Sequence, residues 1–167
     1  MQRRALCAAL AACALRPGTA ASQTAPPTLL VRLADGAERR FGRAELDALP
    51  AEAATATRRD GTPLPLRGVS VTTLLRLTGL DLARPLGGGE VASKALVARA
   101  ADGYVAVFGL AEADPHLGRP PLMVVWQSAD GSPWPERAGD FQLVNAGESR
   151  PMRWVRQLVS LDVRALP

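Results

Sequence analysis

Short apolar segments separated by turn signals dominate the chain from Leu29 onward. The segment LLVRL is followed by the turn pair Asp35-Gly36 and then by AERRF, a pattern that predicts a β-hairpin. A second hairpin is expected where two apolar runs meet at Asp102-Gly103. Three more strands are predicted at residues 122–126, 140–147 and 152–166.

Two segments have helical spacing instead. GRAELDALP, residues 42–50, predicts a short helix that ends at Pro50, because proline cannot continue a helix. In VSVTTLLRLTGL, residues 69–80, Ser70 can cap a helix and Gly79 can end it. The expected buried side of this second helix consists of Val71, Leu74, Leu75 and Leu77.

The stretch between these helices is ambiguous because it contains a threonine-rich, β-prone run and then Pro63 and Pro65, which favour a loop or an edge strand. Residues 81–93, with three consecutive glycines, are expected to form a mobile connection. The total is seven to nine short strands with two or three short helices. This predicts an α+β domain with a mixed-sheet or barrel-like β core.

The N-terminal segment has the layout of a secretory signal peptide. Arg3 and Arg4 precede an apolar run that is too short to span a membrane, and small residues follow up to Ala21. We therefore expect a signal peptide at 1–21, a flexible leader at 22–28, a single domain at 29–167, and a periplasmic or secreted protein. The alternative is a lipoprotein anchored at Cys13, since Leu10-Ala11-Ala12-Cys13 resembles a lipobox.

Composition limits the chemistry of such a mature chain. Both cysteines, Cys7 and Cys13, would leave with the signal peptide, which excludes disulfides, thiolate nucleophiles and thiolate metal sites. The net charge would fall from +4 to +1 with the loss of Arg3, Arg4 and Arg16. Nucleic-acid binding is not expected, because the remaining arginines are scattered and aromatic residues are few.

The order of four motifs resembles a known family, the oxidoreductase molybdopterin-binding domain of sulfite oxidases. The motifs are LRGVSVTTLLRLTGL at 66–80, DGYVAVFGLAEA at 102–113, LMVVWQSADGSPW at 122–134 and RWVRQLVSLDV at 153–163. Together they span about two thirds of the expected mature chain, and the chain is most similar to short, exported, standalone members. The resemblance implies a sulfite-oxidase-like fold and a molybdopterin cofactor.

One departure from the family affects function. The resemblance places a molybdenum-binding cysteine near TATRRDG, residues 55–61, where this chain has none. Threonine and arginine cannot replace a soft thiolate ligand. The first interpretation is a non-catalytic module that binds an anionic small ligand, or a periplasmic or membrane protein partner. The alternative is a redox protein that holds a molybdopterin-type cofactor in periplasmic electron transfer.

Arginines are the candidate anion contacts, because guanidinium groups suit phosphates and carboxylates. Candidate binding residues are Asp102 and Tyr104, in the hairpin that the resemblance places near the pocket, and Arg58, Arg59, Arg150 and Arg153. Asp102 also has a purely architectural interpretation as the first residue of a turn.

Two other kinds of site receive little support from the residues. Glu112, Asp114 and His116 are spaced as a metal cluster could be, but a solvated loop is favoured, since zinc sites need a fixed second shell. A Ser-His-Asp hydrolase would also have to use His116, and the Gly-x-Ser-x-Gly elbow of such enzymes is missing. No catalytic residue and no metal ligand is assigned.

Overall fold

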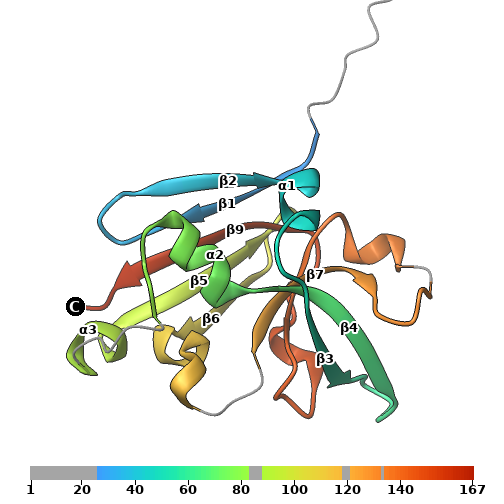
Figure 1. Cartoon of the computed structure of the whole chain (residues 1–167). Coiled ribbons are helices and arrows are strands. Elements are labelled where there is room, and N and C mark those ends of the chain that lie inside the picture. Colours follow the sequence, from blue (N-terminus) through green and yellow to red (C-terminus); the bar gives the residue numbers. More distant parts are fainter. Residues whose placement is uncertain (1–25, 83–87, 118–120, 133) are drawn as a thin grey trace, which may run out of the picture.

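The computed structural model describes residues 26–82, 88–117, 121–132 and 134–167. The expected signal peptide, the lipobox-like segment and most of the leader lie outside them. Nine strands form two sheets in this part of the chain, together with three α-helices, so the α+β prediction is confirmed (Figure 1).

The larger sheet has the strand order β2-β1-β9-β5-β6, which leaves β6 at one edge. β1 and β9 run parallel, and the other neighbours are antiparallel. Both predicted hairpins, β1–β2 and β5–β6, are confirmed. The strands are β1 (Thr28–Arg32), β2 (Glu38–Gly42), β5 (Lys94–Ala100), β6 (Val105–Gly109) and β9 (Leu158–Ala165).

The smaller sheet has the order β3-β4-β7-β8 and is entirely antiparallel. Its strands are β3 (Glu52–Thr57), β4 (Pro63–Ser70), β7 (Leu122–Ser128) and β8 (Gln142–Asn145). β4 lies inside the sheet, but at Pro63 and Pro65 it is paired with β3 alone, so the expectation of an edge strand holds locally at these two residues. The prolines are tolerated there because β7 pairs with β4 only from Leu66 onward.

The helices are short. They are α1 (Arg43–Asp47), α2 (Val71–Thr78) and α3 (Gly88–Ala92), with 3-10 turns η1 (Leu110–Ala113), η2 (Pro115–Leu117), η3 (Glu136–Ala138) and η4 (Pro151–Arg153). α2 begins as predicted, with the Ser70 Oγ accepting a hydrogen bond from the Thr73 amide at 3.3 Å. Two segments were predicted wrongly: residues 88–92 are helical, and the last strand begins only at Leu158 because η4 occupies its expected start.

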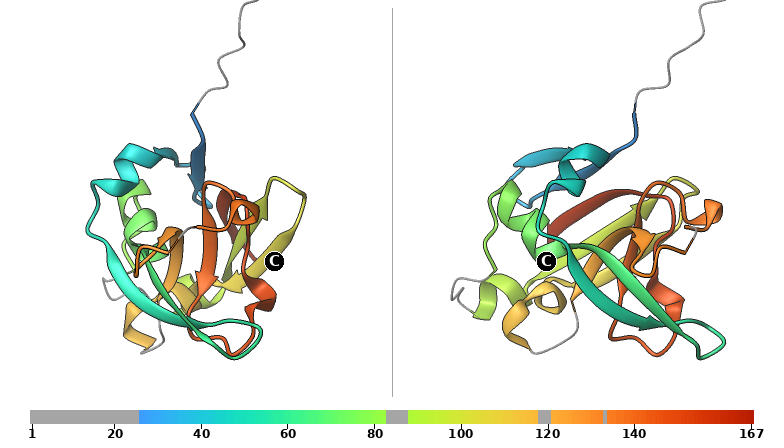
Figure 2. Two further views of the ribbon diagram at one scale, coloured as in Figure 1. Left: turned by 90° about the vertical axis from the view of Figure 1, so that its right-hand side faces the viewer. Right: turned by 45° about the vertical axis from the view of Figure 1, so that its right-hand side comes forward.

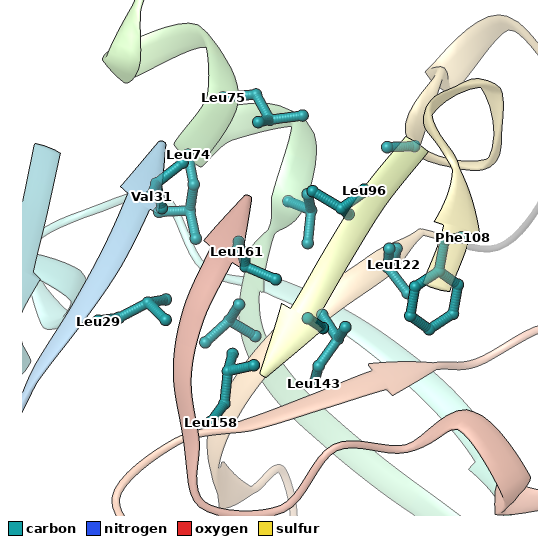
Figure 3. Packing of buried hydrophobic residues seen from close by; sticks show 14 of the residues in the cluster. Leu29, Val31, Leu74, Leu75, Leu96, Phe108, Leu122, Leu143, Leu158 and Leu161 are labelled. Carbon is teal, nitrogen blue, oxygen red and sulfur yellow. The ribbon is translucent and has the colours of Figure 1, made fainter. Parts of the chain in front are cut away.

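One large hydrophobic cluster takes side chains from both sheets and from α2. Leu29 and Val31 of β1, Leu96 of β5 and Leu161 of β9 meet Leu122 of β7 and Leu143 of β8 there (Figure 3). α2 packs on β1 of one sheet and on β4 and β7 of the other.

A second, smaller cluster covers the opposite face of the four-stranded sheet. Met123 and Val125 of β7 and Val144 of β8 belong to it, whereas their neighbours Val124 and Leu143 point into the large cluster. Most of β7 and β8 is therefore buried on both faces of the sheet. Figure 2 shows the tip of the β3–β4 hairpin at the periphery, beside the segment that joins β8 to β9.

Candidate functional site

A pocket of about 430 Å³ lies on the outer face of the four-stranded sheet, beside the smaller cluster. Three stretches of chain line it: the β3–β4 turn, the loop that follows β7, and the region from β8 to Arg156. Its volume falls in the range of pockets that bind small organic ligands. Residues far apart in the sequence thus meet around one cavity.

The charged lining of the pocket is mainly cationic. Arg58, Arg59, Arg137 and Arg156 face a single acid, Asp60, so these side chains carry a net charge of +3. Within the described residues, the guanidinium groups of Arg59, Arg137 and Arg156 have no ion pair or hydrogen bond. Arginines that compensate no internal charge are available to an external anion.

The β3–β4 turn holds Arg58 and Arg59 in place. The Asp60 Oδ1 accepts hydrogen bonds from the Thr62 amide at 3.0 Å and from the Thr62 hydroxyl at 2.7 Å. These bonds, the side-chain bond first, lower the pKa of Asp60, so it is ionised at neutral pH. The Arg58 Nη1 donates to the Pro63 carbonyl at 2.7 Å, which leaves this arginine less free than the other three.

Aromatic and amide groups complete the pocket. Trp134 and Trp154 line it and pack on the smaller hydrophobic cluster. Gln142 of β8 also lines the pocket although it is only 6% exposed. No hydrogen bond is made by its side-chain amide to any of the described residues, so a ligand can use both its donor and its acceptor.

The candidate residues from the sequence divide between two places. Arg58 and Arg59 line the pocket. Arg150 is exposed and does not line it. Asp102, Tyr104 and Arg153 lie at the β5–β6 hairpin and at η4, outside the pocket lining.

In the hairpin, Asp102 shapes the turn. Its Oδ1 accepts a hydrogen bond from the Tyr104 amide at 3.0 Å, and Gly103 has a φ of 88°. These two features are those of an Asx turn followed by a glycine in the left-handed region. The architectural interpretation of Asp102 accounts for every contact that it makes here.

Arg153 is enclosed by acids. Its Nη2 lies 3.0 Å from the Glu112 Oε2, and its Nε donates to the Glu148 Oε1 at 2.6 Å. The pKa of Arg153 is raised, mainly by its hydrogen bond with Glu112. A guanidinium held by two carboxylates has little capacity left for a ligand.

Glu112, Asp114 and His116, the residues that could have formed a metal cluster, make separate contacts. Glu112 bonds to Arg153, while the Asp114 Oδ1 accepts a hydrogen bond from the His116 amide at 2.8 Å. Among the described residues, no group of three or more His, Cys, Asp or Glu side chains lies close enough together to hold a metal ion. The same part of the chain contains no helix long and apolar enough to span a membrane.

Sequence reasoning missed several contributors to the pocket, among them Trp134, Arg137, Gln142, Trp154 and Arg156. Trp134 and Trp154 are two of only three tryptophans, which was a usable signal. Nothing in the sequence distinguishes Arg137 and Arg156 from the other lysine and arginine residues, which number twenty in all.

The side chains that line the pocket match only part of what a molybdopterin-type cofactor requires. Arginines, an amide and indole rings suit an organic anion. The lining contains no cysteine, and the β3–β4 turn presents Arg58, Arg59 and Asp60 in the stretch where the family has its thiolate. The pocket therefore does not fit a thiolate-bound molybdenum centre.

Comparison with known proteins supports the fold. No family model matches the chain, and no curated protein matches it. Among solved structures, the sulfane dehydrogenase SoxCD from Paracoccus pantotrophus is similar, with a TM-score of 0.59 and 16% sequence identity. The match covers 83% of this chain but only 38% of that chain. At this identity the likeness concerns the fold alone: the chain has a sulfite-oxidase-like fold.

Proposed function

We propose that the chain is a non-catalytic binding module whose pocket takes an organic anion with a flat apolar part. The observation that carries the proposal is the grouping of Arg59, Arg137 and Arg156, without internal partners among the described residues, beside two tryptophans. No catalytic base, nucleophile or metal site is part of the proposal.

Each part of the pocket suits a different part of such a ligand. The arginine fork binds phosphate, sulfonate or carboxylate oxygens in a bidentate way. Indole rings contribute apolar surface and can stack on a planar group. The side-chain amide of Gln142 makes no hydrogen bond to the described residues, so it can pair with a polar group carried by the ring.

A calorimetric titration with three probes tests this proposal. We expect 2-naphthyl phosphate to bind more tightly than inorganic phosphate or 2-naphthol, since only the first engages both arginines and indoles. Arg59→Gln, Arg137→Gln and Arg156→Gln should each weaken binding about fivefold, which corresponds to the ~1 kcal/mol of an exposed ion pair. Added salt should weaken it further.

Arg40→Gln is the matched control. Arg40 lies on β2, is exposed, and does not line the pocket, so its loss removes the same charge from another surface. Equal binding by the Arg156→Gln and Arg40→Gln variants would reduce the effect to net charge and overturn the assignment of the pocket. Failure of all three probes to bind would count against the function itself.

A redox role is the second candidate, because the fold is shared with a sulfane dehydrogenase. In that case the arginines would hold the phosphate of a molybdopterin-type cofactor. Elemental analysis and pterin fluorescence of a denatured extract separate the two functions. Stoichiometric molybdenum or pterin would favour the redox role, and a protein free of both that still binds naphthyl phosphate would favour the binding module.

We further propose that the module works in the periplasm or as a secreted protein and binds a periplasmic or membrane protein partner there. The support for export is the pattern of residues 1–21, with its two arginines, apolar run and small residues. Fractionation of cells that express the full chain, with N-terminal sequencing of the product, tests both cleavage after Ala21 and acylation at Cys13.

A further inference from the structure

The segment from Pro151 to Arg156 has two sides. Pro151, Trp154 and Arg156 line the pocket. The Met152 carbonyl and the Arg153 side chain instead contact the β5–β6 hairpin. This short segment is thus a wall of the pocket on one side and is attached to the edge of the larger sheet on the other.

The attachment consists of several direct contacts. The Tyr104 hydroxyl donates to the Met152 carbonyl at 2.6 Å. The Arg153 Nη1 donates to the Val107 carbonyl at 3.3 Å, and its guanidinium carbon lies 4.4 Å from the centre of the Phe108 ring. We propose that Tyr104 and Arg153, with Glu112 and Glu148, form a brace that positions the pocket wall.

The brace uses the backbone of an edge strand. Ala98 and Leu96 of β5 stand opposite Ala106 and Phe108 of β6, and the hairpin is closed by the Ala100 amide bonding to the Tyr104 carbonyl. Antiparallel alternation then turns the backbone groups of Val107 and Gly109 away from β5. Because β6 is an edge strand, no neighbouring strand is there to pair with these backbone groups.

Brace side chains occupy these edge positions. Arg153 takes the Val107 carbonyl, and the Glu112 Oε1 accepts a hydrogen bond from the Gly109 amide at 3.0 Å. Glu112 and Arg153 are also paired with each other. The wall segment is therefore anchored to a strand whose own position is fixed by the five-stranded sheet.

Partial burial strengthens the ion pairs that Arg153 makes with Glu112 and Glu148. The exposed fractions of the side chains are 37% for Arg153, 22% for Glu112 and 18% for Glu148. Charge-assisted hydrogen bonds in a partly buried site are stronger and less screened than those of surface pairs. Arg153 is thus a positioning residue, which acts on a ligand through Trp154 and Arg156.

The test needs no ligand for its first readout. The protein is labelled with 5-fluorotryptophan, and the ¹⁹F signals of Trp126, Trp134 and Trp154 are assigned from single Trp→Phe variants. We expect Tyr104→Phe and Arg153→Gln to shift or broaden the Trp154 signal while that of the buried Trp126 stays in place. Arg153→Lys should restore the signal only in part, because lysine lacks the guanidinium fork.

Affinity for 2-naphthyl phosphate is the second readout, and it rests on the proposed function. Its dissociation constant should rise about threefold in Tyr104→Phe and about tenfold in Arg153→Gln. Arg150→Gln is the matched control, since Arg150 is an exposed neighbour outside both pocket and brace. It should leave both readouts unchanged.

The two proposals fail in different ways. If wild-type protein binds no probe, the proposed function fails, while the fluorine spectra still decide about the brace. The brace is overturned if the Trp154 signal in Arg153→Gln and Tyr104→Phe matches that in Arg150→Gln. Should Arg153→Gln not fold, Tyr104→Phe and Arg153→Lys give the same comparison with smaller changes.

Discussion

Replacing Gly68 with alanine would insert a methyl group where β4 and β7 approach closely. A Cβ at this position would overlap the Val124 carbonyl oxygen and lie 2.8 Å from the Val125 Cγ1. The carbonyl belongs to the backbone of a strand that is paired on both sides, so it cannot turn away. The ladder also shifts register at this point, between Arg67 and Gly68.

The net effect combines two opposing terms. In the interior of a strand, alanine stabilises the fold by about 0.5–1 kcal/mol relative to glycine, because a chain with alanine loses less backbone entropy when it folds. Overpacking costs ~1–3 kcal/mol, and a strained ladder hydrogen bond adds ~1 kcal/mol. We expect a net loss of about 1–3 kcal/mol in the free energy of unfolding.

Urea unfolding followed by far-UV circular dichroism measures this loss as a lower midpoint at unchanged slope. Gly42→Ala is the matched control. Gly42 has an ordinary φ of −81°, and a Cβ there would meet nothing within 4 Å. If Gly68→Ala proved as stable as Gly42→Ala, the close approach of β4 to β7 would be refuted.

Three further outcomes are expected. Asp102→Asn should change stability by well under ~1 kcal/mol in thermal unfolding, because asparagine forms the same turn; a larger loss would contradict a purely turn-shaping role. Hydrogen bonds from Ser128 first and then Ser132 lower the pKa of Asp130 from 3.8 to about 2. Its stabilising contribution is therefore present above pH 3.8 and is lost as the pH falls through 2, so a carboxyl ¹³C titration midpoint near 3.8 would disprove these bonds. Leu74→Ala, at a fully buried position on α2, should cost ~2–5 kcal/mol in urea unfolding.

Local signals explain which elements could be predicted from the sequence. The helix after Ser70 combines a cap, a three-to-four residue spacing and a terminal glycine, all within a few residues of one another. The pairing of β4 with β7 joins segments about sixty residues apart, and no local signal reveals that the ladder starts beyond Pro65. The start of β9 was missed because Met152, Trp154 and Val155 extend an apolar pattern upstream of Leu158.

The pocket was only partly predictable for the same reason. Arg58 and Arg59 adjoin a recognisable turn, and the affinity of guanidinium groups for anions made them candidate binding residues; both line the pocket. The same reasoning selected Arg153, and only the fold shows that Glu112 and Glu148 pair with its guanidinium. Arg137 and Arg156 join the pocket through the packing of η3 and of the segment before β9, which a linear pattern does not encode.

The burial of β7 on both faces of its sheet has a consequence for aggregation. β7 begins with five buried apolar residues, LMVVW, and contains no charge, which is typical of segments that assemble into cross-β structures when exposed. Trp134 and Trp154 help to cover the side of β7 that carries Met123 and Val125. The wall of the pocket therefore also covers an aggregation-prone strand. Variants that loosen this wall are expected to become turbid on mild heating well before the whole fold melts.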